Sequence, residues 1–148
     1  MNRVIIMWIG SLALLSACAP KEGIEVRDAW MRSAAQGENG AVYLVIHNYS
    51  ETADALVGAS TDVAAVVEVH ESKVVNDVMQ MQMLASVPLA PGASVEFAPG
   101  GLHLMLVNLT RSLEAGDTIT ITLQFQDAPD ITLSIPVQVG PDHSDHDD

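Results

Sequence analysis

The chain has 148 residues, a length that indicates one domain rather than two. It carries 6 basic and 19 acidic side chains, which gives a formal net charge of −13. A chain this negative repels nucleic-acid phosphates and anionic lipid headgroups, so the composition argues against a nucleic-acid-binding protein. It suits a cationic ligand or a basic protein partner, although acidic side chains that only confer solubility would give the same composition.

Residues 1–17 have the pattern of a secretory signal peptide. A short basic start precedes an apolar run over residues 4–15 that is too short to remain across a bilayer. Residues 15–18 (LSAC) resemble the lipobox of bacterial lipoproteins, in which cleavage precedes a cysteine that is then lipidated. Cys18 is the only cysteine, so no disulfide can form within the chain. We expect a lipid anchor on Cys18; the alternative is an ordinary signal peptide with a chance cysteine.

The residues after the lipobox bear on where the protein is anchored. Ala19 follows the cysteine, whereas Asp at that place usually means retention in the inner membrane, so the outer membrane is favoured. Cleavage would remove Arg3 and leave 5 basic and 19 acidic side chains, a net charge near −14. Residues 18–23 would then form a short tether that holds the domain close to the membrane, in the periplasm.

The body of the chain, residues 24–139, has the pattern of an all-β domain. Strands are predicted where residues are β-branched or alternate between apolar and polar: 41–46, 63–71, 78–84, 118–125 and 131–139. Asn76 and Asp77 have the composition of a tight turn, which predicts a hairpin between the two strands that flank them. Pro136 marks the last strand as an edge strand or a bulged one.

Many short strands with regular turn residues indicate a β-sandwich or barrel. No segment shows a helical period except residues 110–115, which are too short for more than a single turn. Residues 140–148 form an acidic tail that we expect to be disordered. His143 and His146 in this tail could hold Cu(II) or another divalent ion loosely, but a solvated acidic tail is an equally good interpretation.

Methionine and histidine are distributed unevenly in the predicted domain. Four of the seven methionines lie between residues 79 and 105, and His70 and His103 enclose most of that segment. His103 and Met105 are two residues apart, so on a strand they project to the same face, opposite the leucines that alternate with them. A hairpin carrying Met79, Met81 and Met83 could bring thioethers next to them, because His70 lies in the preceding strand.

Imidazole and thioether ligands together select for one metal ion. Thioethers bind Mg²⁺, Ca²⁺ and Zn²⁺ poorly but Cu(I) well, and they need no deprotonation. Each residue also has a simpler interpretation, since methionine usually fills gaps in a core and a histidine is usually a surface or hydrogen-bonded residue. His47 fits the simpler interpretation, because the residues after it look like the end of a strand.

The four residues His70, Met81, His103 and Met105 match, in type and in all three spacings, the motif of the periplasmic copper(A) chaperone family, known as PCuAC. The flanking segments are similar as well, namely residues 28–32 (DAWMR), 40–44 (GAVYL), 69–71 (VHE), 99–106 (PGGLHLML) and 113–117 (LEAGD). The resemblance covers residues 24–139. Many members carry Met directly after the first histidine, where this chain has Glu71.

The resemblance implies a cupredoxin-like, Greek-key β-sandwich or barrel with an exposed Cu(I) site formed by His70, Met81, His103 and Met105. It implies a copper chaperone that delivers the ion to the copper centre of cytochrome c oxidase, directly or through another copper chaperone. Met79 and Met83 lie outside the motif and are not assigned as ligands. A general role in periplasmic copper binding or tolerance is the alternative within this class.

Three other classes of protein compete with this interpretation. A blue-copper electron carrier needs a Cys ligand, and Cys18 lies outside the predicted domain. An enzyme could use Glu68 or Glu71 as a general base, but no catalytic signature accompanies them, and we predict that the chain is not an enzyme. A lipoprotein interaction module that binds no metal would have the same strand pattern.

Overall fold

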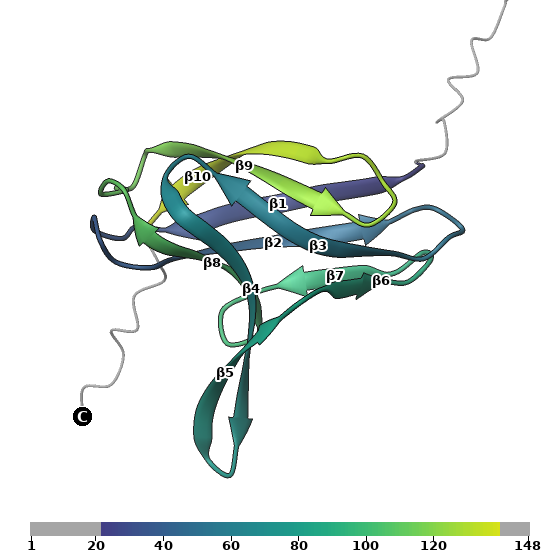
Figure 1. Ribbon diagram of the computed structural model, residues 1–148, viewed down its shortest axis with the longest axis horizontal. Helices are drawn as coiled ribbons and strands as arrows, with labels where there is room; N and C mark the ends of the chain where they lie inside the picture. Colours follow the sequence, from purple (N-terminus) through teal and green to yellow (C-terminus); the bar gives the residue numbers. More distant parts are fainter. Residues whose placement is uncertain (1–21, 140–148) are drawn as a thin grey trace, which may run out of the picture.

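The computed structural model describes residues 22–139, and every regular element in that range is a β-strand (Figure 1). The strands are β1 (Ile24–Arg32), β2 (Gly40–Asn48), β3 (Asp54–Thr61), β4 (Ala64–Val75), β5 (Val78–Leu84), β6 (Val87–Leu89), β7 (Ser94–Phe97), β8 (Leu102–Leu109), β9 (Thr118–Phe125) and β10 (Ile131–Gln138). Within this range no helix is long and apolar enough to cross a membrane. The predicted signal peptide, the anchor at Cys18 and the tail of residues 140–148 lie outside the described residues.

The strands form one sheet that closes on itself. Their order is β5-β4-β8-β7-β2-β1-β10-β9-β3-β6, and additional pairings join β3 to β4 and β2 to β8. The pairing of β3 with β4 closes the sheet into a barrel, since these two strands lie near opposite ends of that order. The predicted all-β, cupredoxin-like barrel is confirmed.

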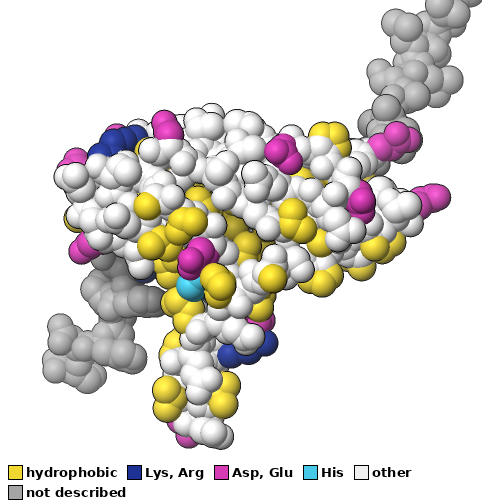
Figure 2. All heavy atoms as spheres, in the orientation of Figure 1, with side chains coloured by type: hydrophobic (Ala, Val, Ile, Leu, Met, Phe, Trp, Pro, Cys, Tyr) yellow, Lys and Arg dark blue, Asp and Glu magenta, His cyan; other side chains and the backbone are white. Residues whose placement is uncertain are grey.

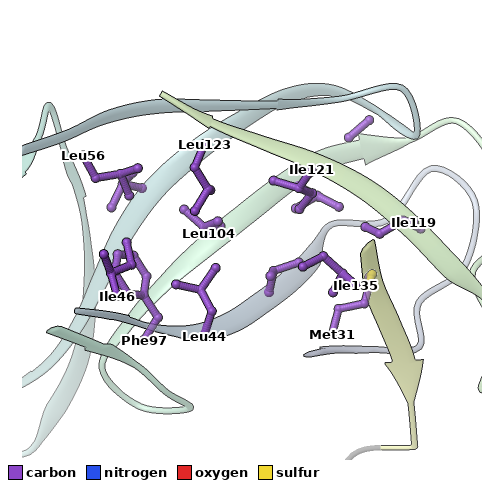
Figure 3. Packing of buried hydrophobic residues seen from close by; sticks show 14 of the residues in the cluster. Met31, Leu44, Ile46, Leu56, Phe97, Leu104, Ile119, Ile121, Leu123 and Ile135 are labelled. Atoms are coloured by element: carbon purple, nitrogen blue, oxygen red, sulfur yellow. The ribbon is translucent and has the colours of Figure 1, made fainter. Parts of the chain in front are cut away.

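The interior of the barrel is filled by the alternating apolar side chains of its strands. Leu104 of β8 is fully buried and lies between Leu123 of β9 and Leu44 of β2 (Figure 3). Met31 is also fully buried, as is usual for a methionine that fills a core. Because side chains alternate along a strand, the residues next to Leu104 on β8 are directed to the outer face of the sheet.

The hairpin of β4 and β5 projects from the barrel (Figure 1). Val75 pairs with Val78, which leaves a two-residue turn in which Asn76 has φ 52° and Asp77 has φ 61°. Positive φ at both central residues matches the right-handed twist of the flanking strands, and Asn and Asp tolerate it better than most residues. The predicted tight turn at these two residues is confirmed, and β4 is longer than the predicted 63–71.

Other strand predictions are also confirmed. Segments 41–46, 78–84, 118–125 and 131–139 each fall on a strand to within a few residues. Pro136 lies in the part of β10 that pairs with β9 alone, because β1 pairs with β10 only at Val137 and Gln138. Proline is accommodated because β1 does not pair with β10 at this residue, but β10 lies between β1 and β9, so the prediction of an edge strand is wrong. Residues 110–115, where at most a single helical turn is expected, contain an isolated β-bridge between Ala34 and Leu113.

Candidate metal centre

His70 and His103 are direct neighbours across two antiparallel strands. The register of β4 against β8 pairs these two residues, and their ring centroids lie 5.8 Å apart with 53° between the ring planes. Residues opposite each other in an antiparallel pair project to the same face of the sheet. The fold therefore brings two histidines that are distant in the sequence to one place on the outer face.

The two predicted methionines lie on that same face. Met105 follows His103 by two residues on β8 and is paired with Glu68. Met81 is paired with Ser72 on β4, two residues beyond His70. All four predicted ligand residues thus share the outer face of the β5-β4-β8 portion of the sheet, and their coordination of a metal stays a prediction.

The exposure of these side chains changes across the three strands. His103 is only 5% exposed, the His70 side chain is 15% exposed, and Met81 on the edge strand is 53% exposed. Figure 2 shows a histidine beside an acidic side chain where the hairpin leaves the body, with hydrophobic side chains along the hairpin. The site is closed around its imidazoles and open at Met81 on the edge strand.

One hydrogen bond defines the tautomer of His103. Nδ1 of His103 lies 3.1 Å from the carbonyl oxygen of Gly101. A carbonyl oxygen only accepts, so Nδ1 carries the proton and donates it, and the lone pair of the neutral ring is on Nε2. A carbonyl contact of this kind is how metal-ligating histidines are commonly oriented.

His70 is held by a carboxylate. Its Nε2 lies 2.7 Å from Oε2 of Glu68, two residues earlier on the same face of β4. An ionised carboxylate only accepts, so Nε2 is the protonated nitrogen of the neutral ring and Nδ1 has the lone pair. Nδ1 of His70 is buried and has no hydrogen-bond partner. A buried acceptor without a partner is unfavourable unless a ligand satisfies it, so this atom fits a site for a metal ion.

The donor set also fits a soft cation. Among residues 22–139, no group of three or more His, Cys, Asp and Glu side chains could hold a metal ion. The thioethers of Met81 and Met105 lie on the same face as His70 and His103 and could complete a metal site there. Two imidazoles with thioethers favour Cu(I) over Zn²⁺, Mg²⁺ or Ca²⁺.

Sequence reasoning considered Glu68 only as a general base, although on a strand it shares the face of His70, and so it missed the hydrogen bond between the two side chains. Two neutral imidazoles and two neutral thioethers carry no charge that could balance a cation. The carboxylate beside His70 supplies one negative charge next to the site. The signal was in the sequence, since residues two apart on a strand share a face.

His47 has other contacts, as expected for a histidine that is not a ligand. Its Nδ1 lies 2.5 Å from Oγ of Ser94, and its ring centroid lies 3.8 Å from that of Tyr49. His47 is therefore a matched control for histidine substitutions at the site.

These observations define the class of the protein as an all-β, cupredoxin-like domain with a histidine–methionine cluster on its outer face. The chain belongs to the LpqE-like family: the model of that family, described as "Putative lipoprotein LpqE-like", matches residues 24–137. One relative, from Leifsonia xyli subsp. xyli, is described as "Putative lipoprotein Lxx21020". It is 36% identical over 118 residues, which span 79% of this chain and 70% of the relative.

Solved structures of PCuAC domains have the same fold. The copper-bound PCuAC domain from PmoF2 is 24% identical to this chain, with a TM-score of 0.67 over 79% of this chain and 93% of that domain. The solution structure of CuI-DR1885 from Deinococcus radiodurans is 25% identical, with a TM-score of 0.56 over 78% of this chain and 80% of that protein. The resemblance of the sequence to PCuAC domains is confirmed, and at the level of the family it fits a protein that is not an enzyme.

Proposed function

We propose that this protein is an extracytoplasmic copper chaperone that binds one Cu(I) ion through His70, Met81, His103 and Met105. The observation that carries the proposal is the direct cross-strand pairing of His70 with His103, on the face that also bears both methionines. Copper-bound relatives with the same fold support the choice of metal.

Different residues of the site would serve binding and release. The carbonyl of Gly101 and the carboxylate of Glu68 orient the two imidazoles before the ion arrives, which lowers the cost of ordering them. The exposed thioether of Met81 leaves one side of the site open to a partner protein. A site that is ordered on one side and open on the other suits a protein that holds its cargo and then gives it up.

The test is a competition titration of the purified protein against a coloured Cu(I) chelator, under reducing and oxygen-free conditions. The wild type should withdraw one equivalent of Cu(I), His103→Ala should withdraw far less, and His47→Ala should match the wild type. Failure of the wild type to compete would refute copper binding and leave the interaction module as the better description.

The recipient follows from the resemblance, and we infer that it is the copper centre of cytochrome c oxidase, reached directly or through another copper chaperone. Deletion of the gene should lower oxidase activity, and added copper or the wild-type gene should restore it, whereas the His103→Ala gene should not. Increased sensitivity to copper with normal oxidase activity would instead favour the general role in copper binding and tolerance.

The anchor is a separate part of the proposal. Names of relatives describe lipoproteins, which supports lipidation of Cys18 and a location on the periplasmic side of a membrane, with the outer membrane favoured. Metabolic labelling with a fatty acid, followed by membrane fractionation, should label the wild type and not Cys18→Ala. Equal labelling of both would exclude Cys18 as the lipidated residue.

The tail of residues 140–148 is tested independently of the main site. If His143 and His146 hold Cu(II), the His143→Ala/His146→Ala variant should lose a weak Cu(II) site and keep Cu(I) binding unchanged. Identical Cu(II) titrations of variant and wild type would show that the tail is only a solvated acidic segment.

A further inference from the structure

Three thioethers form a row on the outer face of the edge strand β5. Met79, Met81 and Met83 alternate with Gln80 and Gln82, so the methionines project to one face and the glutamines to the other. The register against β4 shows that the methionine face is the face of His70. Residues two apart on a strand are about 6.6–6.8 Å apart, so the row places a sulfur-bearing side chain at each step along the hairpin.

The register places Met83, and not Met81, directly opposite His70. His70 is paired with Met83 on one side and with His103 on the other, so these three residues form a straight row across β5, β4 and β8. Directly opposite residues have Cβ atoms about 4.5–5.5 Å apart, whereas diagonal neighbours such as His70 and Met81 are about 7–8 Å apart. A methionine side chain has three rotatable bonds, so both sulfurs can reach the space beside His70.

The methionines of β5 are unusually exposed. Met79, Met81 and Met83 are 61%, 53% and 63% exposed, and β5 is an edge strand whose single neighbour is β4. An edge strand with a row of exposed apolar side chains risks pairing with other chains, and soluble proteins usually avoid it. The two thioethers nearest the oriented imidazoles, those of Met81 and Met83, are better explained as part of a site for a soft cation than as packing, because they do not lie in the core.

We propose that Met83 is a further Cu(I) ligand in this protein, interchangeable with Met81. This inference rests on the proposed function, since it concerns the same ion at the same pair of histidines. The ion would stay on His70 and His103 while one thioether of β5 replaces the other, so a sulfur can leave without release of the metal. The exchange takes place on the open side of the site, where a recipient could contribute its own ligand.

The test compares leucine substitutions at the three positions of the row, which keep size and apolarity and remove the sulfur. Met81→Leu and Met83→Leu should each weaken Cu(I) binding by less than about tenfold, because the other thioether takes over, and the double variant should weaken it by more than about 100-fold. Met79→Leu, one step farther along the same face and paired with Val74, is the matched control and should bind like the wild type. Thermal unfolding of each variant checks that the fold is kept.

A second readout is the rate at which the loaded protein gives Cu(I) to a chelator. This rate should rise in Met83→Leu and in Met81→Leu, and stay unchanged in Met79→Leu. Wild-type affinity and release rate in Met83→Leu, together with no added loss in the double variant relative to Met81→Leu, would overturn the role of Met83. That result would leave the proposed function intact, whereas absence of Cu(I) binding by the wild type would refute the proposed function itself.

Discussion

The carboxylate of Glu68 accepts a hydrogen bond from Nε2 of His70 over 2.7 Å, and both side chains lie on the outer face of β4. This contact has two consequences for a cation. It fixes the ring so that the unpaired Nδ1, with its lone pair, is the nitrogen available to bind a metal ion. It also places a negative charge beside the site. The pair therefore resembles the carboxylate–histidine arrangements that orient ligands in other metal proteins.

Substitution of Glu68 by Gln should weaken Cu(I) binding without unfolding the protein. The amide oxygen can still accept the proton of His70, but the negative charge is lost, and loss of such a partner typically costs about 10–100-fold in metal affinity. Glu71→Gln is the control, because Glu71 is the next acidic residue on the same strand, projects to the opposite face and pairs with Lys73 at 2.8 Å. Equal Cu(I) affinities for the two variants in a chelator competition would exclude a role for the Glu68 charge.

Met105 should contribute to copper affinity and little to stability. Met105→Leu conserves volume and apolarity, so the free energy of unfolding should fall by less than about 1.5 kcal/mol. If its sulfur binds Cu(I), the same substitution should lower the affinity measured against a chelator. Met31→Leu makes the identical chemical change at a fully buried methionine of the core and should leave copper binding unchanged. A similar loss in both variants would indicate an indirect effect of packing.

The strands and the shared face of the site could be predicted from the sequence because both depend on a period of two. Alternation in residues 118–125 and the spacing of His103 and Met105 are local properties, and the structure follows them. The strands β3, β6 and β7 lie outside the predicted ranges. For β6 and β7 the reason is length, since three or four residues between prolines and glycines carry too little alternation.

The pairing of β4 with β8, which places His70 opposite His103, could not be derived from local pattern. The partner of His70 on β5, in contrast, follows from the two-residue turn at Asn76 and Asp77, because a turn of this length pairs Val75 with Val78 and therefore His70 with Met83. A shift of the pairing by two residues would place Met81 rather than Met83 opposite His70. The contact of Glu68 with His70 depends on rotamers that no spacing rule specifies.

Asp54 connects the start of β3 to the segment that follows β9. Its Oδ1 accepts hydrogen bonds from the backbone N–H groups of Ala55 and Asp127, and its Oδ2 accepts one from Ala128. Partial burial acts to raise the pKa of the Asp54 carboxyl, but these backbone donors outweigh it and hold the pKa below the usual value of 3.8. The carboxylate form is therefore favoured in the native state.

The free energy of unfolding should fall in acid as Asp54 becomes protonated. Because the pKa of Asp54 is lower in the native than in the unfolded chain, its contribution is complete above the unfolded value of 3.8 and is lost as pH falls through the native one. Asp54→Asn should lower the free energy of unfolding by about 1 kcal/mol at neutral pH, a value reduced for solvent screening, and the difference from wild type should vanish in strong acid. Asp130→Asn, at an exposed aspartate, is the control in thermal unfolding at several pH values.

The turn of the β4–β5 hairpin should become more stable with glycine at its second position. Asp77 has φ 61°, a left-handed conformation that glycine adopts without steric cost, so Asp77→Gly should slow hydrogen exchange of the β5 amides. Asp62→Gly, at a residue without positive φ, should have no such effect and should cost about 0.5–1 kcal/mol through chain entropy. If the hairpin presents Met81 and Met83 to the metal, its stabilisation by Asp77→Gly should also raise Cu(I) affinity, because less ordering accompanies binding. Slower exchange with unchanged Cu(I) affinity would mean that the hairpin is already fully ordered for the metal or takes no part in holding it. The Met81→Leu/Met83→Leu variant distinguishes these two cases, because it loses Cu(I) affinity only if the hairpin holds the metal.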